Sequence, residues 1–99
     1  MDANTLAKYF KILADETRLN IISFLKNGTM CACNILEKLN ITQPTLSYHM
    51  KILSKYAIVT FEKKGVWVHY TLNKKTFTAL TKFFDFELKE DKICSCKNK

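Results

Sequence analysis

The sequence predicts a mostly α-helical domain with one small β-hairpin, in the order α-α-α-α-β-β-α. Apolar residues recur at intervals of three and four in the first half of the chain, which is the period of amphipathic helices. From Ile58 to Leu72 they alternate with polar residues, and after Lys75 the helical spacing returns. A chain of 99 residues with 47% hydrophobic content has room for one modest core, so we expect a single domain.

The first two helices are short. One runs from about Asn4 to Leu13, and its apolar stripe consists of Leu6, Tyr9, Phe10 and Leu13. Asp15 offers an N-cap oxygen for the next helix, which carries Leu19, Ile22 and Leu25. Gly28 suits a left-handed C-cap, so the second helix is expected to end just before it.

A helix, a tight turn and a second helix are predicted next. The first covers about residues 31–39, and Asn40-Ile41 forms the turn. Thr42 can cap the fourth helix, and Pro44 falls in its first turn, where a backbone N–H is not needed. The hairpin should then turn at Lys63-Lys64-Gly65. A last helix from about Lys75 to Lys89 completes a domain of residues 1–89, followed by a polar tail at 90–99.

The net charge of +7 and the isoelectric point near 9.3 favour a polyanionic partner, with nucleic acid as the first candidate. Surplus lysine that serves only solubility is the alternative, and the position of the charge decides between the two. Residues 42–75 hold six lysines against one glutamate, a net +5. The excess charge is therefore concentrated around the fourth helix and the hairpin.

The fourth helix has two different faces. At 100° per residue, Leu46, Met50 and Leu53 share one stripe. The opposite side is cationic and able to donate hydrogen bonds; it carries Pro44, Ser47, Tyr48, Lys51 and Lys55, and Thr45 flanks it. A helix-turn-helix followed by a basic hairpin predicts DNA binding through this side.

Three segments resemble signature segments of the ArsR/SmtB family of winged helix-turn-helix repressors: Leu13–Leu19, Thr42–Leu53 and Gly65–Leu72. The resemblance implies a homodimeric repressor whose fourth helix enters the major groove and whose hairpin is the wing. It implies DNA contacts by Gln43, Thr45, Ser47, Tyr48 and Lys51, and phosphate contacts by Lys63 and Lys64. Glu16 departs from the family pattern, which often has Pro there, and this affects only a helix start.

The last predicted helix independently favours a homodimer, because it is apolar on two faces. One stripe consists of Phe77, Leu80, Phe84 and Leu88, and the roughly opposite stripe consists of Ala79, Phe83 and Phe86. A helix with two apolar faces needs two partners, and so small a domain supplies only one. We expect the second face to meet another subunit, together with the first helix.

The four cysteines form two pairs, Cys31/Cys33 and Cys94/Cys96. Neither a membrane-spanning run nor a signal segment is apparent, so we expect a cytoplasmic protein whose thiols stay reduced and serve metal or redox chemistry. Cys31 and Cys33 both fall on the predicted third helix, about 200° apart, so both cannot face the core and at least one thiol is accessible. A position near a helix N-terminus favours thiolates, and one ion bound by both should distort that helix.

The segment Met30–Ile35 resembles the cysteine motif of arsenic- and antimony-responsive family members, which implies As(III) or Sb(III) as inducer. Where the arsenic-type pattern often has a further cysteine, this chain has Leu36. Trivalent arsenic favours three thiolates, so we expect Cys94 or Cys96 to be the substitute third ligand. The zinc site that other members build on the last helix needs histidine, and residues 75–89 contain none.

Other interpretations of the cysteines stay open at this stage. The same repressor could sense Cd(II), Pb(II), Cu(I) or thiol oxidation, or all four cysteines could hold one structural zinc ion. His49 is expected on the DNA face or in packing, and His69 on a hairpin strand, rather than as ligands. No arrangement of residues typical of an enzyme active site is present in the sequence, so an enzyme is not expected.

Overall fold

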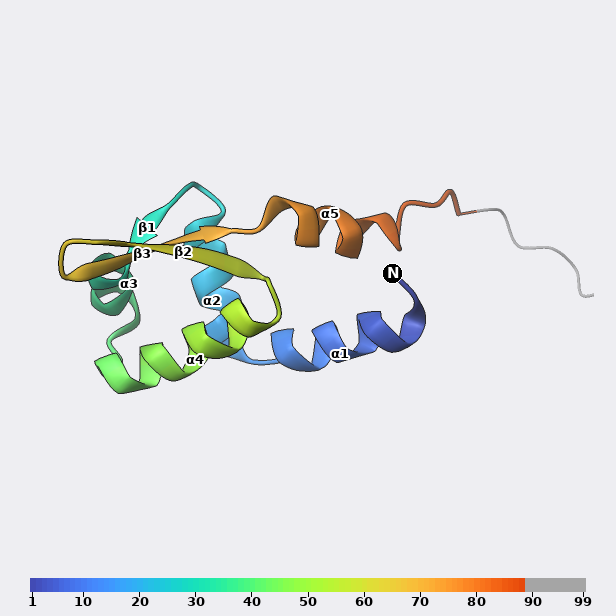
Figure 1. Ribbon diagram of the computed structural model, residues 1–99. Coiled ribbons are helices and arrows are strands. Elements are labelled where there is room, and N and C mark those ends of the chain that lie inside the picture. The colour runs from blue at the N-terminus through green and yellow to red at the C-terminus, as the bar shows by residue number, and fades with distance from the viewer. Residues whose placement is uncertain (89–99) are drawn as a thin grey trace, which may run out of the picture.

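The computed structural model describes residues 1–88, and Figure 1 shows how the elements are arranged. Within those residues the helices are α1 (Ala3–Leu13), α2 (Glu16–Leu25), α3 (Ala32–Leu39), α4 (Gln43–Lys55) and α5 (Lys74–Lys82). The strands are β1 (Met30–Cys31), β2 (Val59–Lys64) and β3 (Trp67–Leu72). The predicted order of helices and hairpin is confirmed, and β1 is an additional element.

Side-chain caps start α2 and α4, as predicted. Asp15 Oδ1 accepts a hydrogen bond from the Arg18 backbone N–H at 3.0 Å, and this bond is the main reason that the pKa of Asp15 is lowered. Thr42 Oγ1 accepts from the Thr45 backbone N–H at 3.3 Å. The predicted cap at Gly28 is wrong: α2 ends earlier, with Lys26 as its right-handed C-cap, and Gly28 takes a φ of 130° in the turn that follows.

The three strands form one antiparallel sheet in the order β1-β3-β2. Lys64 pairs with Trp67, so the hairpin turns at Gly65-Val66 and not at the predicted Lys63-Lys64-Gly65. Gly65 has a φ of 65°, which suits the first central position of a two-residue hairpin turn. Both lysines therefore belong to a strand, and the strand's alternation sends them to opposite faces of the sheet.

The hydrophobic core lies where α2, α3 and α4 meet the end of the sheet farthest from the hairpin turn. The predicted stripe of α4 is buried there. The buried residues of this cluster are Ile12, Ile21, Leu25, Ile35, Leu46, Met50, Leu53, Ile58 and Val59. Burial of one face fixes which side of α4 is left for solvent.

The last helix is shorter than predicted, because α5 ends at Lys82. After it, the N–H of Phe84 bonds to the Thr81 carbonyl at 3.0 Å, a tighter i to i−3 pattern. The Thr81 hydroxyl also donates to the carbonyl of Phe77 at 3.0 Å, which competes with the helical ladder. The predicted stripes therefore do not continue on one helix, since Phe86 and Leu88 lie beyond its end.

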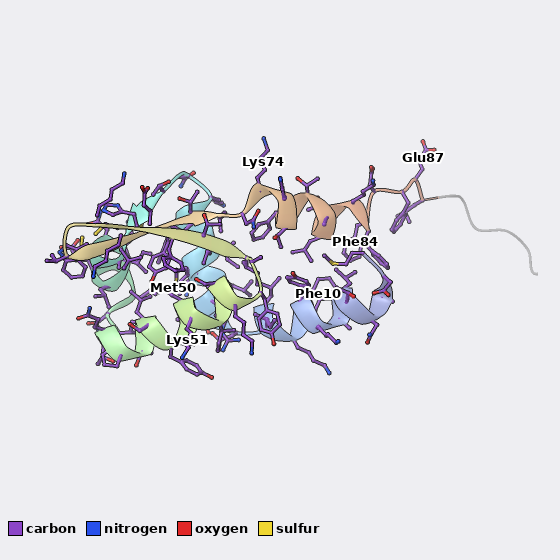
Figure 2. The ribbon with its side chains drawn as sticks, in the orientation of Figure 1. Phe10, Met50, Lys51, Lys74, Phe84 and Glu87 are labelled. Carbon is purple, nitrogen blue, oxygen red and sulfur yellow. The ribbon has the colours of Figure 1, made fainter. Side chains whose placement is uncertain are left out.

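The helices α1 and α5 extend together away from the hairpin tip, at the right of Figure 1. The rings of Phe10 and Phe84 stack between them, with centroids 6.1 Å apart, and Figure 2 labels both residues. This end of the molecule exposes several large apolar side chains, namely Phe10, Phe83, Phe84, Phe86 and Leu88. Among residues 1–88, no helix has the length and apolar character that crossing a membrane requires.

Candidate nucleic-acid interface and thiol site

The turn between α3 and α4 gives a helix-turn-helix its geometry. Asn40 adopts a left-handed conformation, with a φ of 54°, and its N–H bonds to the Leu36 carbonyl at 3.0 Å. Thr42 then caps α4. Because α3 closes with a left-handed residue and α4 opens two residues later, the two helices cannot merge into one.

The five predicted DNA-contacting residues of α4 are all exposed: Gln43, Thr45, Ser47, Tyr48 and Lys51. Tyr48 is the one aromatic residue of these five, and 59% of its surface is exposed. Figure 2 shows Lys51 pointing away from the core, whereas Met50 points toward it. The Thr45 hydroxyl accepts from the Thr42 hydroxyl at 2.9 Å and keeps its own proton to donate.

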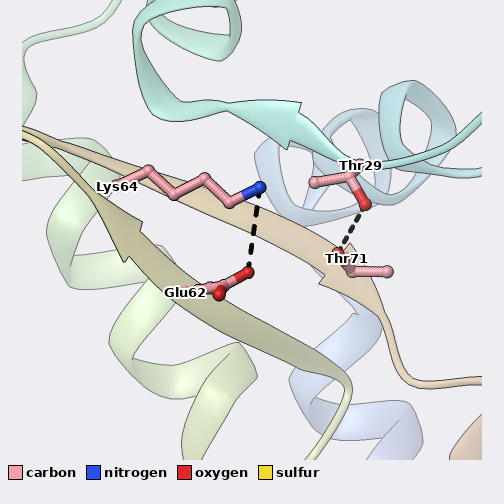
Figure 3. A network of polar contacts seen from close by, with 4 residues as sticks. All are labelled: Thr29, Glu62, Lys64 and Thr71. Carbon is pink, nitrogen blue, oxygen red and sulfur yellow. Dashed lines mark hydrogen bonds and ion pairs between the residues drawn. The ribbon is translucent and has the colours of Figure 1, made fainter.

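The two hairpin lysines are both exposed but lie on different faces of the sheet. Lys63 pairs with Val68, which faces α4, so Lys63 lies on that same face. Lys64 lies on the outer face, where its Nζ is 3.9 Å from Glu62 Oε1 (Figure 3). The charge of Lys64 is thus partly offset by a neighbour, whereas Lys63 adds to the charge beside α4.

A shallow groove of about 260 Å³ separates α4 from the hairpin. Its floor is mostly apolar and its rim carries hydroxyl and ammonium groups; the lining residues are Ser47, Met50, Lys51, Ser54, Phe61, Val68 and Tyr70. Burial raises the pKa of Tyr70 above its ordinary value. The groove joins the exposed side of α4 to the inner face of the hairpin in one continuous surface.

The thiol pair differs from the sequence prediction. Cys31 is not a helical residue: its backbone is extended, it ends β1, and it is the N-cap of α3. Its sulfur accepts a hydrogen bond from the Cys33 backbone N–H at 3.3 Å. The predicted separation of about 200° around one helix is therefore wrong, and both side chains gather at the start of α3.

This arrangement shifts the pKa values of the two thiols in opposite directions. The pKa of Cys31 is lowered by the Cys33 side chain and by the backbone N–H groups of Cys33 and Asn34. The pKa of Cys33 is raised by the same side-chain contact, by burial and by the charge on Cys31. Cys31 is therefore the better thiolate and Cys33 the donor that supports it.

The sheet register sets Cys31 opposite His69, and His69 opposite Glu62, on the outer face. His69 is thus on a hairpin strand, as predicted. Next to them, the hydroxyls of Thr29, the residue before β1, and Thr71 of β3 are 2.7 Å apart (Figure 3). Among the described residues, no three His, Cys, Asp or Glu side chains are grouped so as to hold a metal ion. Cys94 and Cys96 lie outside the described residues.

Comparison with known proteins assigns the family. The model of the arsR family of bacterial regulatory proteins matches residues 15–60, from the cap of α2 to the start of β2. A Staphylococcus xylosus protein named arsenical resistance operon repressor is 38% identical over 98 residues, covering 99% of this chain and 94% of that protein. The chain belongs to the ArsR family.

Further relatives agree with this assignment. A Bacillus subtilis protein, also named arsenical resistance operon repressor, is 43% identical over 79 residues, covering 76% of this chain and 75% of its own. The solved structure of HlyU from Vibrio cholerae N16961 matches with a TM-score of 0.71 and 27% identity, covering 85% of this chain and 94% of that one. This ArsR-family protein is therefore a winged helix-turn-helix transcriptional repressor and not an enzyme.

The contact between Arg18 and His49 in this ArsR-family protein could not be predicted from the sequence. Arg18 lies on α2, yet its side chain reaches His49 on α4. His49 is 8% exposed, so of its two predicted positions it takes the one in packing. The sequence could have drawn attention to Arg18, because it lies within the family segment Leu13–Leu19 and three residues after the helix cap. The neighbouring residues do not indicate its partner.

Proposed function

We propose that this protein is a homodimeric cytoplasmic repressor that leaves its operator DNA when Cys31 and Cys33 bind trivalent arsenic or antimony. The observation that carries the proposal is the pair of thiols at the start of α3, the helix directly before α4. The names of the relatives, arsenical resistance operon repressors, support the choice of inducer.

In this proposal α4 lies in the major groove. Tyr48 and Lys51 project from the middle of its exposed side, while Gln43, Thr45 and Ser47 occupy its first turns, where a recognition helix approaches base edges. Lys63 contacts phosphate from the inner face of the hairpin, and Lys64 from the outer face. Phosphate contacts supply affinity and orientation, and base contacts supply specificity.

Two copies of the domain, residues 1–89, associate through α1 and α5. Support comes from the exposed aromatic side chains at that end, because contiguous apolar surface on a small protein marks an interaction site. A two-fold dimer presents its two α4 helices to half-sites about one helical turn of DNA apart, which predicts a palindromic operator.

Inducer binding acts on the cap of α3. Arsenous acid condenses with three thiols to give three As–S bonds and three molecules of water, so each sulfur loses its proton. Bonding of the Cys31 and Cys33 sulfurs to one arsenic turns the Cys31 sulfur away from the Cys33 N–H, and the first turn of α3 loses its cap. Cys94 or Cys96 of the tail, residues 90–99, supplies the third thiolate. The change reaches α4 through the short turn at Asn40.

The test is a titration of the protein bound to an operator duplex with arsenite, antimonite, Cd(II), Pb(II), Zn(II) and hydrogen peroxide in separate arms. Release by arsenite and antimonite at the lowest concentrations is expected. A double Cys31→Ser, Cys33→Ser variant should bind the duplex and ignore arsenite, and a Cys94→Ser, Cys96→Ser variant should need more of it. Release by Cd(II), Pb(II) or peroxide alone would refute the proposed inducer.

A structural zinc site would give a different result. Protein purified without chelator would retain one zinc ion per chain and unfold when the ion is removed. A metal-free protein that keeps its fold and still binds the duplex excludes that role for the cysteines.

A further inference from the structure

Arg18 links three helices through its own atoms. Its backbone N–H donates to the cap residue Asp15, and its Nη1 donates to the carbonyl of Ile12 in α1 at 2.9 Å. Its Nε donates to Nδ1 of His49 in α4 at 3.1 Å. The guanidinium therefore spans from the last turn of α1, across α2, to the middle of α4.

The same guanidinium lies over the ring of Tyr48, with Cζ 5.9 Å from the ring centroid. His49 meets this ring edge to face, with centroids 5.2 Å apart. Tyr48 is thus held from the protein side by Arg18 and His49 while most of its surface remains exposed. An exposed tyrosine with two such contacts has fewer orientations than a free one.

We propose that Arg18 is a positioning residue for operator recognition: it fixes the Tyr48 ring and, through His49, the placement of α4 against α1. The inference rests on the proposed role of α4 in DNA binding. Arginine suits this task because its planar group offers donors in several fixed directions, and here Nε and Nη1 serve different helices. A lysine has one ammonium on a flexible stem and cannot make both contacts in this geometry.

The hydrogen-bonded form of His49 follows from the geometry. Nδ1 accepts from Arg18, so it carries no proton, and the neutral ring is protonated at Nε2. The tautomer can be read by nitrogen NMR of the free protein, with His69→Gln used to assign the signals, since the chain has two histidines. Arg18→Leu offers no donor, so it should raise the share of the tautomer protonated at Nδ1, and an unchanged tautomer population in that variant would overturn the proposal.

The binding experiment uses a duplex enriched by the wild-type protein from a random-sequence pool, together with a scrambled duplex of the same composition. Arg18→Gln and Arg18→Lys should each weaken binding to the enriched duplex about tenfold, the order expected for one hydrogen bond and one cation–π contact. Binding to the scrambled duplex should change little. In a Tyr48→Ala background, Arg18→Gln should cost much less, because the two residues act together.

Three outcomes would overturn the proposal. If Arg18→Lys binds like wild type, and Arg18→Gln weakens binding to both duplexes equally, then Arg18 is a phosphate contact. If the effects of Arg18→Gln and Tyr48→Ala are independent, Arg18 does not act through the ring. If Arg18 variants bind like wild type, Arg18 has no part in recognition, whereas failure of the wild type to enrich any duplex refutes the DNA-binding function itself.

A second pair of variants covers the case in which Arg18 variants fold poorly. His49→Asn offers an oxygen near the position of Nδ1, whereas His49→Leu fills similar space and removes the acceptor. Binding to the enriched duplex should be close to wild type for Asn and several-fold weaker for Leu, with both thermal unfolding midpoints measured as the control. Equal binding by the two variants would contradict the proposal.

Discussion

The helix α4 and the hairpin form one continuous surface, but the rest of the fold packs against α4 much more extensively than against the hairpin. Four residues of α4 are buried, namely Leu46, His49, Met50 and Leu53, and Arg18 braces it from α2. The hairpin buries only Val59 in β2, and every later residue of that strand is exposed. A braced helix can present side chains in fixed positions to base edges, whereas an exposed hairpin contributes mainly charge. Separate elements therefore supply the rigidity and the charge of this surface.

The largest effect should come from the buried face of α4. Leu53 is fully buried, so Leu53→Ala should lower the free energy of unfolding by about 2–5 kcal/mol through lost burial and a residual cavity. Phe61 on the hairpin is 62% exposed, and Phe61→Ala should cost less than about 1 kcal/mol. Urea unfolding of both variants measures the difference, and similar losses would show that the hairpin is packed as firmly as α4.

Next in size are the exposed residues of α4. Tyr48→Ala and Lys51→Ala should each weaken binding to the enriched duplex by about 1–3 kcal/mol while changing the unfolding midpoint little, because both side chains are exposed. Gel-shift titrations against the enriched and scrambled duplexes check both effects. Equal affinity of both variants and wild type would show that α4 does not read the operator.

The hairpin lysines should produce a smaller and less selective loss. Lys63→Gln should weaken binding to both duplexes alike and reduce the slope of log affinity against log salt by about one. Lys64→Gln should do less, because Glu62 already offsets part of the charge of Lys64. A loss confined to the enriched duplex would mean that the hairpin, and not only α4, reads the DNA sequence.

The smallest effect should be on stability at the outer face of the hairpin. Glu62→Gln removes an exposed ion pair of 3.9 Å and should change the free energy of unfolding by less than about 0.5 kcal/mol. The same variant should slightly strengthen DNA binding, since it removes a negative charge beside the proposed phosphate contact. A marked loss of stability would show that the hairpin is held more firmly than its exposure indicates.

Local patterns predicted most of the elements. Asp15 and Thr42 were identified as caps because an N-cap needs only a side-chain oxygen just before an apolar period. The buried stripe of α4 and its cationic face followed from a single helical period. The ends of helices are harder to predict. The helix α5 stops at Lys82 because the Thr81 hydroxyl and the tighter turn at Phe84 compete with the helical hydrogen bonds. The spacing of apolar residues does not indicate this competition.

The candidate thiol site was predicted in composition but not in shape. The sequence singled out Cys31 and Cys33, yet it put both on a helix. A strand of two residues has too few positions to form a recognisable period. Only its pairing of Met30 with Tyr70 and of Cys31 with His69 defines it. The strand ends at Cys31, which caps α3, and there the Cys33 side chain and the N–H groups of Cys33 and Asn34 lower the pKa of Cys31. This cap is the basis of the uncapping step in the proposed release.

The sequence by itself thus determined what depends on neighbours along the chain: the helices, their starts, the charge at residues 42–75 and the position of the first thiol pair. Tertiary structure decided what depends on residues far apart. The Arg18–His49 bond joins positions 31 residues apart, and the Thr29–Thr71 contact joins positions 42 apart. Periodicity says which face of an element is apolar, but which partner meets it is set only when the whole chain packs, because long-range contacts form between surfaces and not between neighbours.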